Sequence, residues 1–348
     1  MTEDWGVVTP DARTLGYTEA LRDVMIASRP SGGRSVGRVI RVDRSSVLIV
    51  RTTDIETSVS AGASADLVVG DWIWMADDGS VASRMDRTSV VIRAHADGIP
   101  QVLGANVDLV LLVVDADRAD RSGLIERLAM IGWESGSTPH FVVTKIDRAT
   151  PERRAAIHTA LTNYAPGIET TMVSATENAG RDALAELFSN GKTALLVGHS
   201  GVGKSTLLNW LVEGAIAQVG SVRERDAKGR HTTTARTLYP IPDIGGSVID
   251  TPGIREIGIT SRESLENVFG DILELTTECR YSDCQHKRDD GCALREAVET
   301  GLLERDRYRR FLAYLGEADT HGVIAAQGRD KTRESTRFAR EFRRIRGH

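Results

Sequence analysis

The segment LLVGHSGVGKSTLLNWL, residues 195–211, holds a glycine-rich turn between an apolar run and a helical pattern. Within it, Gly198 to Ser205 fits G-x-x-x-x-G-K-[ST], a loop whose backbone N–H groups surround phosphate oxygens at a helix N-terminus. In such a loop Lys204 reaches the terminal phosphates and Ser205 binds Mg²⁺. The segment therefore predicts a nucleotide site, and a chance glycine turn is the weaker interpretation because the flanking strand and helix patterns are also present.

Nearly two hundred residues precede this loop, although such a loop normally opens its domain. The chain has 348 residues, of which 41% are hydrophobic and 27% charged, enough for about two or three domains with their own cores. A net charge of -5 predicts no general attraction to nucleic acid. Residues 329–348 are the local exception, with eight Lys or Arg against three acids.

The sequence predicts a cytoplasmic protein without membrane contact. No apolar run approaches the roughly 18 residues needed to span a bilayer. The first residues, MTEDWGVVTPDARTLG, lack the apolar centre of a signal peptide. All three cysteines fall between positions 279 and 292, which favours a metal site over a disulfide scaffold.

The patterning predicts a multidomain chain with four parts. Residues 1–34 form an extension with one short helical piece, YTEALRDVMIA. Residues 35–97 contain about five short segments rich in Val and Ile, which suit a small β-barrel, and the OB-fold is a barrel of this size that binds nucleic acid. A barrel that only packs on its neighbour fits the pattern equally well.

In residues 98–262 buried-strand runs alternate with helical stretches, which indicates βαβ units and a mostly parallel sheet in an α/β domain. Thr150 followed by Pro151 predicts a helix start there. Residues 263–348 become helical and charged around the cysteines and end in the basic tail.

The motif VIDTPG ends a strand pattern about 45 residues after the phosphate loop. Asp250 can hold the Mg²⁺ shell through water, and the Gly253 N–H can face the γ-phosphate. Between the two motifs lies AKGRHTTTARTL, whose threonines can complete the metal shell. We predict Thr233 and Ser205 as magnesium ligands, with Thr232 and Thr234 as the alternatives to Thr233.

Base specificity is predicted from VVTKID, residues 142–147. The Asp147 carboxylate can accept guanine N1–H and the exocyclic amine, whereas adenine would leave it unpaired at a cost that rejects the wrong base. Lys145 can lay its stem over the ring. The alternative interpretation is a strand that ends at a capped helix. It accounts for the run of Val residues but not for the presence of both Lys145 and Asp147. In VSAT, residues 173–176, the Ala175 N–H would meet guanine O6.

Together these elements are those of a Ras-type GTPase in which the base-reading motifs precede the phosphate-reading ones, so the domain is predicted to be circularly permuted. Permutation is tolerable because the termini of α/β domains often lie close together and each loop still projects from the same end of the sheet. The predicted nucleotide-binding residues are Thr144, Lys145, Asp147, Ser174, Ala175, Gly198, His199, Ser200, Gly201, Val202, Gly203, Lys204, Ser205, Thr206, Asp250 and Gly253.

The segment ECRYSDCQHKRDDGCAL predicts a structural zinc site. Cys279, Cys284, His286 and Cys292 supply three thiolates and one imidazole within 14 residues, which matches a closed tetrahedral Zn²⁺ site with one ion per chain. Three buried structural cysteines are the alternative. Catalytic zinc is disfavoured because four protein ligands leave no open position.

The permuted order, the barrel in front and this cysteine spacing resemble the RsgA (YjeQ) family of ribosome small-subunit-dependent GTPases over about residues 35 to 315. NVDLVLLV from Asn106 and GRHTTT from Gly229 also look like that family. The resemblance implies late maturation of the small (30S) ribosomal subunit, binding of 16S rRNA through the barrel and the zinc domain, and release after GTP is hydrolysed to GDP. We also expect a monomer.

One position departs from the family pattern. The family's base-reading motif usually begins with Asn, and here that position is Thr144. A hydroxyl reaches less far than a carboxamide, so we expect a lower GTP affinity, while Asp147 should still set the base preference.

Catalysis lacks an obvious water-orienting side chain. Ile254 stands where Ras-type enzymes place a Gln, and it can neither donate nor accept a proton. His231, which matches the family's proposed catalytic His, is the predicted catalytic residue together with Lys204. A solvated His, or one that touches rRNA, is the alternative for His231.

Two other functions compete with a ribosome-stimulated GTPase. A P-loop kinase or ATPase predicts adenine binding and leaves Lys145, Asp147 and the zinc site unexplained. An RNA-binding module with a nucleotide switch predicts negligible turnover. Competition between ATP and GTP distinguishes the kinase or ATPase from a GTPase. Turnover measured with and without ribosomal subunits distinguishes the RNA-binding switch from a GTPase.

Overall fold

The computed structural model of the chain describes residues 14–27, 29–31, 35–43, 46–51, 56–60, 66–93, 101–212, 236–241, 243–251 and 262–320. The chain divides into two compact units. The first consists of Met1–Ile92 and Val102–Arg255, and the second of Arg93–Gln101 and Glu256–His348. Several predicted residues lie outside the described part of the chain, namely His231, Thr233, Gly253, Ile254 and the basic tail.

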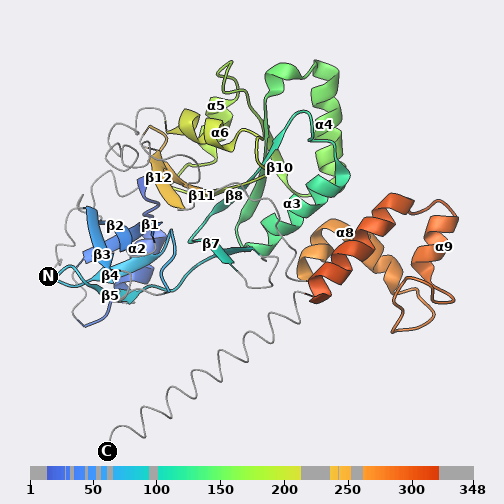
Figure 1. Cartoon of the computed structure of the whole chain (residues 1–348), viewed down its shortest axis with the longest axis horizontal. Helices are drawn as coiled ribbons and strands as arrows, with labels where there is room; N and C mark the ends of the chain where they lie inside the picture. The colour runs from blue at the N-terminus through green and yellow to red at the C-terminus, as the bar shows by residue number, and fades with distance from the viewer. Residues whose placement is uncertain are drawn as a thin grey trace, which may run out of the picture. The chain divides into compact units, whose positions relative to one another are not determined.

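A parallel sheet forms the centre of the first unit (Figure 1). Its strands run in the order β10-β9-β8-β11-β13, and β12 pairs antiparallel with β13. Every residue of β8 is buried, as expected of a strand covered on both faces. The bounds are β8 Leu109–Asp115, β9 Thr138–Thr144, β10 Glu169–Met172, β11 Thr193–Val197, β12 Thr237–Ile241 and β13 Gly246–Asp250.

Helices cover both faces of this sheet, which confirms the expected α/β layers. On one face, residues of α5 (Arg181–Glu186) and α6 (Lys204–Leu211) share an apolar core with alternate residues of β8, β11 and β13. On the other face, α3 (Ser122–Glu134) contacts β8 and β9, and α4 (Pro151–Tyr164) packs on α3.

Two local features explain how α3 and α4 are positioned. A Cβ on Gly132 of α3 would lie 2.7 Å from the Pro139 side chain, so this close approach to the sheet requires glycine. At the start of α4 the Thr150 hydroxyl accepts a hydrogen bond from the Arg153 N–H at 3.3 Å, with Pro151 as the first helical residue. The predicted helix start is confirmed.

The predicted β-rich region forms an antiparallel arrangement in the first unit, preceded by α2 (Glu19–Ala27). Strand β1 pairs with β2 and β4, β2 with β3, and β4 with β5, around a core that includes Val39, Ile49 and Ile73. β1 also meets β12 through the pair Arg41 and Thr237, so these strands continue the α/β sheet. The bounds are β1 Ser35–Val42, β2 Ser46–Arg51, β3 Glu56–Ser60, β4 Trp72–Met75 and β5 Val81–Arg84.

Arg38 of β1 is a buried charge that ties this β-rich region to the α/β sheet. Its side chain donates to the Thr193 hydroxyl of β11 at 2.8 Å, to the Asn106 carbonyl at 3.0 Å and to the Leu15 carbonyl. The guanidinium also lies 4.9 Å from the ring centroid of Trp72. Burial lowers the pKa of Arg38 to about 10, so the hydrogen bonds are what make the buried charge tolerable.

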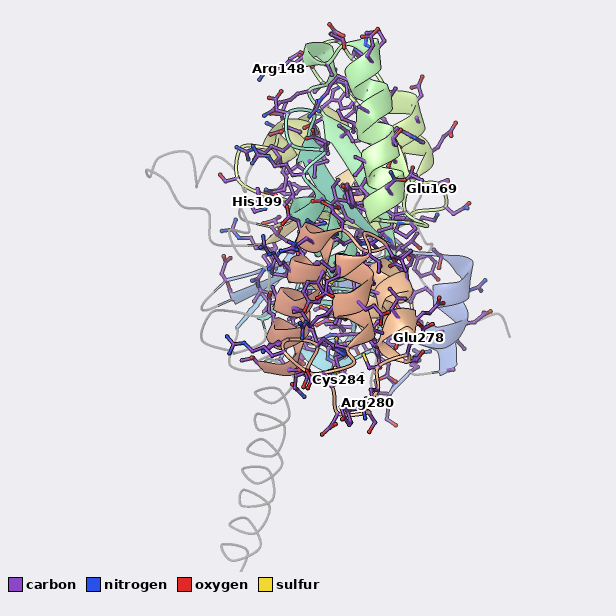
Figure 2. All side chains as sticks on the ribbon, turned by 90° about the vertical axis from the view of Figure 1, so that its right-hand side faces the viewer. Arg148, Glu169, His199, Glu278, Arg280 and Cys284 are labelled. Carbon is purple, nitrogen blue, oxygen red and sulfur yellow. The ribbon has the colours of Figure 1, made fainter. Side chains whose placement is uncertain are left out.

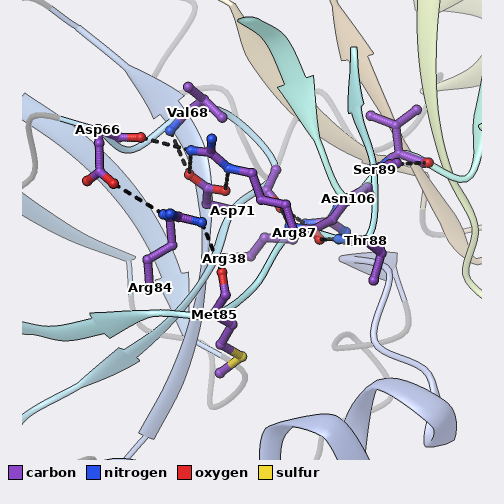
Figure 3. A network of polar contacts seen from close by, with 12 residues as sticks. Arg38, Asp66, Val68, Asp71, Arg84, Met85, Arg87, Thr88, Ser89 and Asn106 are labelled. Atoms are coloured by element: carbon purple, nitrogen blue, oxygen red, sulfur yellow. Dashed lines mark hydrogen bonds and ion pairs between the residues drawn. The ribbon is translucent and has the colours of Figure 1, made fainter. Parts of the chain in front are cut away.

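A second polar network lies beside Arg38 (Figure 3). The buried Asp71 carboxylate receives two hydrogen bonds from Arg87, at 2.7 and 2.8 Å, and one from the Val68 N–H at 2.8 Å. Asn106, at the end of β7 (Gln101–Ala105), accepts from the Thr88 N–H and donates to the Gly70 carbonyl. β7 also pairs with β6 (Val90–Arg93). The chain that leads into β8 is therefore held both by this strand pairing and by the hydrogen bonds of Asn106.

The second unit is helical, as predicted for the region after the α/β domain. It contains α8 (Glu263–Thr276), α9 (Ala293–Glu299) and a helix over residues 305–320. Phe269 packs near Phe311 and Tyr314, with ring centroids 5.7 and 5.9 Å away. Within the described residues, no helix combines the length and apolar character needed to cross a membrane.

Replacing Arg38 with Ala should lower the free energy of unfolding by about 3–5 kcal/mol, because it breaks a buried charged network. The Leu15 and Asn106 carbonyls would lose a donor. Urea unfolding followed by tryptophan fluorescence measures the change, since Trp72 lies against Arg38.

The matched control is Arg84→Ala, which removes a more exposed ion pair to Asp66 in the same region. It should change stability by no more than about 1 kcal/mol. Equal effects of the two substitutions would contradict the role given to Arg38.

Candidate functional site

Those predicted nucleotide-site residues that the structure describes lie at one edge of the sheet. β8 ends at Asp115, β9 at Thr144 and β13 at Asp250, and the glycine-rich loop follows β11. Because β8, β9, β11 and β13 are parallel, their carboxyl ends share this edge, which is where ligands bind in open α/β sheets. Motifs that lie far apart in the sequence are therefore brought together.

The loop from Gly198 to Ser205 has the backbone that phosphate binding requires. Gly201 and Gly203 adopt positive φ angles of 82° and 101°, which favour glycine. Gly198 packs against the Val113 carbonyl so closely that a Cβ would clash. The loop leads into α6, and the first N–H groups of a helix have no acceptor within the helix itself.

Lys204 is buried within this loop. Its ammonium donates to the Gly198 carbonyl at 2.5 Å and the His199 carbonyl at 2.9 Å. Burial lowers the pKa of Lys204, while the nearby Asp250 opposes that shift. The charge therefore lies at the centre of the loop, where it can meet phosphate oxygens.

His199 is half-buried beside basic groups. Burial lowers its pKa, and Arg118, Lys204 and Arg127 act in the same direction. These effects therefore favour the neutral imidazole. Together with Lys204, the two arginines give this part of the site a positive field that suits an anion.

Asp147 is oriented by the loop that follows β10. The Ser174 hydroxyl donates to the Asp147 carboxylate at 2.7 Å, and this hydrogen bond is the main cause of the lowered pKa of Asp147. Ser174 itself is fully buried and lies 2.9 Å from the Thr176 hydroxyl. Asp147 is thus held as a carboxylate by the Ser174 hydroxyl, and its oxygens can accept hydrogen bonds.

The loop after β9, residues 144–147, which we call the base loop, is hydrogen-bonded to the glycine-rich loop, residues 198–205, which we call the phosphate loop. The Lys145 ammonium donates to the Gly201 carbonyl at 2.7 Å, and the Thr144 hydroxyl to the Val202 carbonyl at 2.5 Å. Lys145 has a left-handed backbone with φ of 59°. It also lies 3.6 Å from the Asp115 carboxylate.

Sequence reasoning missed two supports of this site. Asp115, which pairs with Lys145, could have been found because it is the last residue of a buried strand that ends at the same edge. The Trp210 indole N–H of α6 donates to the Asn178 side chain at 2.9 Å and so links the helix after the phosphate loop to the Ser174 loop. Sequence spacing carries no signal for this contact.

The four predicted metal ligands converge in the second unit. The candidate ligand atoms of Cys279, Cys284, His286 and Cys292 all lie within 4.8 Å of one another. The His286 Nδ1 is 3.5 Å from the Cys279 sulfur and 3.8 Å from that of Cys292. These two distances from His286 fit one tetrahedral ion, because Zn–S and Zn–N bonds of about 2.0–2.3 Å set ligand atoms under 4 Å apart.

The surroundings of this cluster suit a metal. Burial lowers the pKa of His286, which favours the neutral imidazole that a metal binds. His286 has a positive φ of 59°, and its carbonyl accepts a hydrogen bond from the Tyr308 hydroxyl. Cys284 and Arg280 lie on the loop between α8 and α9 (Figure 2). The Arg280 N–H closes this loop by donating to the Gly291 carbonyl at 3.0 Å.

Comparison with known sequences identifies relatives over most of the chain. A model of the RsgA GTPase family matches residues 84–260. The small ribosomal subunit biogenesis GTPase RsgA of Streptomyces coelicolor is 37% identical, over 87% of this chain and 86% of that protein. RsgA 2 of Listeria monocytogenes is 32% identical, over 91% of this chain and 93% of that protein.

Solved structures agree with these relatives. YjeQ from Thermotoga maritima aligns with a TM-score of 0.59 and 25% identity, over 82% of this chain and 98% of that chain. YloQ, described as a circularly permuted GTPase, has a TM-score of 0.55 and 22% identity over 84% of this chain, a likeness of fold. The order of motifs along this chain has the same permutation, since the base loop precedes the phosphate loop. On the family match and the relatives' identity, the chain belongs to the RsgA GTPase family.

Proposed function

We propose that this chain hydrolyses GTP as an assembly factor of the small ribosomal subunit. One observation carries the proposal. The Asp147 carboxylate, which is held by the Ser174 hydroxyl, and the glycine-rich loop lie at the same edge of the sheet. The relatives' names, small ribosomal subunit biogenesis GTPase, supply the partner.

In this proposal Asp147 accepts the guanine N1–H and amine, the Lys145 stem covers the ring and the Ala175 N–H meets O6. The phosphates lie in the loop from Gly198 to Thr206, against Lys204. Ser205, Thr233 and, through water, Asp250 would hold Mg²⁺, which lessens the charge repulsion between phosphate and nucleophile. Adenine is rejected because it would leave Asp147 facing an acceptor.

Changing Asp147 to Asn should weaken GDP binding by about 10²-fold or more, because hydrogen bonds to a charged group contribute about 1.5–3 kcal/mol each. The variant should gain affinity for xanthosine diphosphate, whose ring has a carbonyl where guanine has the amine. Displacement of a fluorescent GDP analogue by GDP, xanthosine diphosphate and ADP measures both effects.

The control is Asp243→Asn, an exposed position in the turn between β12 and β13, at the opposite end of the sheet. It should bind GDP as the unchanged protein does. Equal competition by ADP and GDP in the unchanged protein would reject the base assignment.

We further propose that Cys279, Cys284, His286 and Cys292 hold one structural Zn²⁺. Three thiolates and an imidazole are the donors that zinc prefers in closed sites, and their mutual distances support one ion. The ion would hold the turn between α8 and α9, in a unit with a small apolar core.

Cys284→Ser should remove most of the bound zinc and unfold the second unit, because metal binding energy in so small a core is also folding energy. GDP affinity should persist, since the nucleotide residues belong to the first unit. Metal analysis, limited proteolysis and GDP titration measure the three effects.

Asp283→Ser, the exposed neighbour, is the control and should keep its metal. Zinc well below one ion per chain in freshly purified, unchelated protein would exclude the site.

The remaining assignments concern the ribosome. We propose that β1 to β5 act as an OB-fold barrel over residues 35–97, and that it and the zinc domain, residues 263–348, bind 16S rRNA. The nucleotide domain would span residues 98–262. The protein would act as a cytoplasmic monomer, and the role of residues 1–34 is not assigned.

We propose that His231 positions or activates the attacking water, since Ile254 cannot. Lys204 would stabilise the charge that develops on the transferred phosphoryl group. The support for His231 is the sequence alone, because it lies outside the described residues.

GTP turnover should be slow in isolation and should rise by about 10²- to 10⁴-fold with small ribosomal subunits, the range that a positioned acid–base group contributes. Large subunits should stimulate much less. His231→Ala should lose the stimulation while retaining GTP binding, measured by phosphate release and by titration.

The control is His158→Ala, an exposed histidine on α4, which should remain stimulated. Full stimulation of His231→Ala would reject its catalytic role. An unchanged protein that no small subunit stimulates at any salt concentration would reject the partner.

A further inference from the structure

Thr144, the last residue of β9, faces the phosphate loop. Its side chain is 6% exposed, and its hydroxyl oxygen lies 2.5 Å from the Val202 carbonyl oxygen and 3.3 Å from that of Val114. A Cβ on Gly203 would lie 3.5 Å from the same hydroxyl oxygen. The side chain of Thr144 therefore packs directly against the loop.

A count of donors limits what Thr144 can do. A threonine hydroxyl has a single proton, and both oxygens within its reach are carbonyl acceptors. Its lone pairs can accept hydrogen bonds but cannot bond to another acceptor. Once its proton is given to the Val202 carbonyl, Thr144 has no donor left for a ligand.

Besides its N1–H and amine donors, guanine presents two acceptors, O6 and N7, on its major-groove edge. In the proposed site the Ala175 N–H meets O6, so N7 still requires a donor. A carboxamide at position 144 would have two N–H groups, one for the loop and one for N7. The single donor of Thr144 cannot serve both.

We propose that Thr144 is a positioning residue that fastens the phosphate loop to the base loop, and that the site consequently reads guanine without a hydrogen bond to N7. The inference rests on the proposed guanine site. Lys145 extends the connection by donating to the neighbouring Gly201 carbonyl at 2.7 Å. Two consecutive residues of one loop thus hold two consecutive carbonyls of the other, which orders the phosphate loop before the ligand arrives.

The test compares GDP with 7-deaza-GDP, in which a C–H group replaces N7 and every other hydrogen-bonding group is kept. Both should displace a fluorescent GDP analogue from the unchanged protein with affinities within about twofold. Thr144→Asn should favour GDP by about 2- to 10-fold, the effect of one net hydrogen bond. A preference of the unchanged protein for GDP above about fivefold would overturn the inference.

A second set of variants tests the connection between the loops. Thr144→Val removes the hydroxyl at constant shape and should weaken GDP and 7-deaza-GDP equally, by about fivefold. Thr144→Ser restores the donor and should recover most of that loss for both nucleotides. Unchanged binding by Thr144→Val would overturn the positioning role.

ADP separates this inference from the proposed function. If ADP binds the unchanged protein as tightly as GDP, the guanine site itself is wrong. If ADP is rejected but 7-deaza-GDP binds much more weakly than GDP, only the role of Thr144 is wrong.

Discussion

The parallel pairing of β8, β9, β11 and β13 is the constraint on which the site depends. Parallel strands bring their carboxyl ends to one edge, so the loops after them meet whatever their order along the chain. The base loop can therefore precede the phosphate loop without any change in geometry. Hydrogen bonds from Thr144 and Lys145 then join the two loops across 56 to 58 residues of sequence.

Arg38 connects the β-rich region to the same parallel sheet. A buried guanidinium is costly, as the lowering of its pKa to about 10 indicates, and the hydrogen bonds that Thr193, Asn106 and Leu15 accept offset this cost. Thr193 is the first residue of β11, the strand that ends at the phosphate loop. The charge thus fixes the start of that strand against β1 and joins the two regions within the first unit.

Much of this architecture could be predicted because the signals are local. The glycine spacing of the phosphate loop, the Thr150 and Pro151 helix start and the cysteine spacing each follow from backbone or ligand geometry over a few residues. The role of Arg38 could not be predicted, since a charge in the pattern GRVIRVD is typical of a solvent-facing strand position. Its burial depends on contacts with residues as far along the chain as Thr193. The direction of the Thr144 hydroxyl is unpredictable for the same reason, because the acceptor lies in another loop.

The permuted order also determines where the chain leaves the first unit. Thr251, which follows β13, is 2% exposed, and its hydroxyl donates to the Leu196 carbonyl of β11 at 2.8 Å. The residue just before the segment 252–261 is therefore fastened to the strand that carries the phosphate loop. In an unpermuted domain this segment would continue into the next strand of the same sheet, whereas here it leads to α8 and the cysteine cluster.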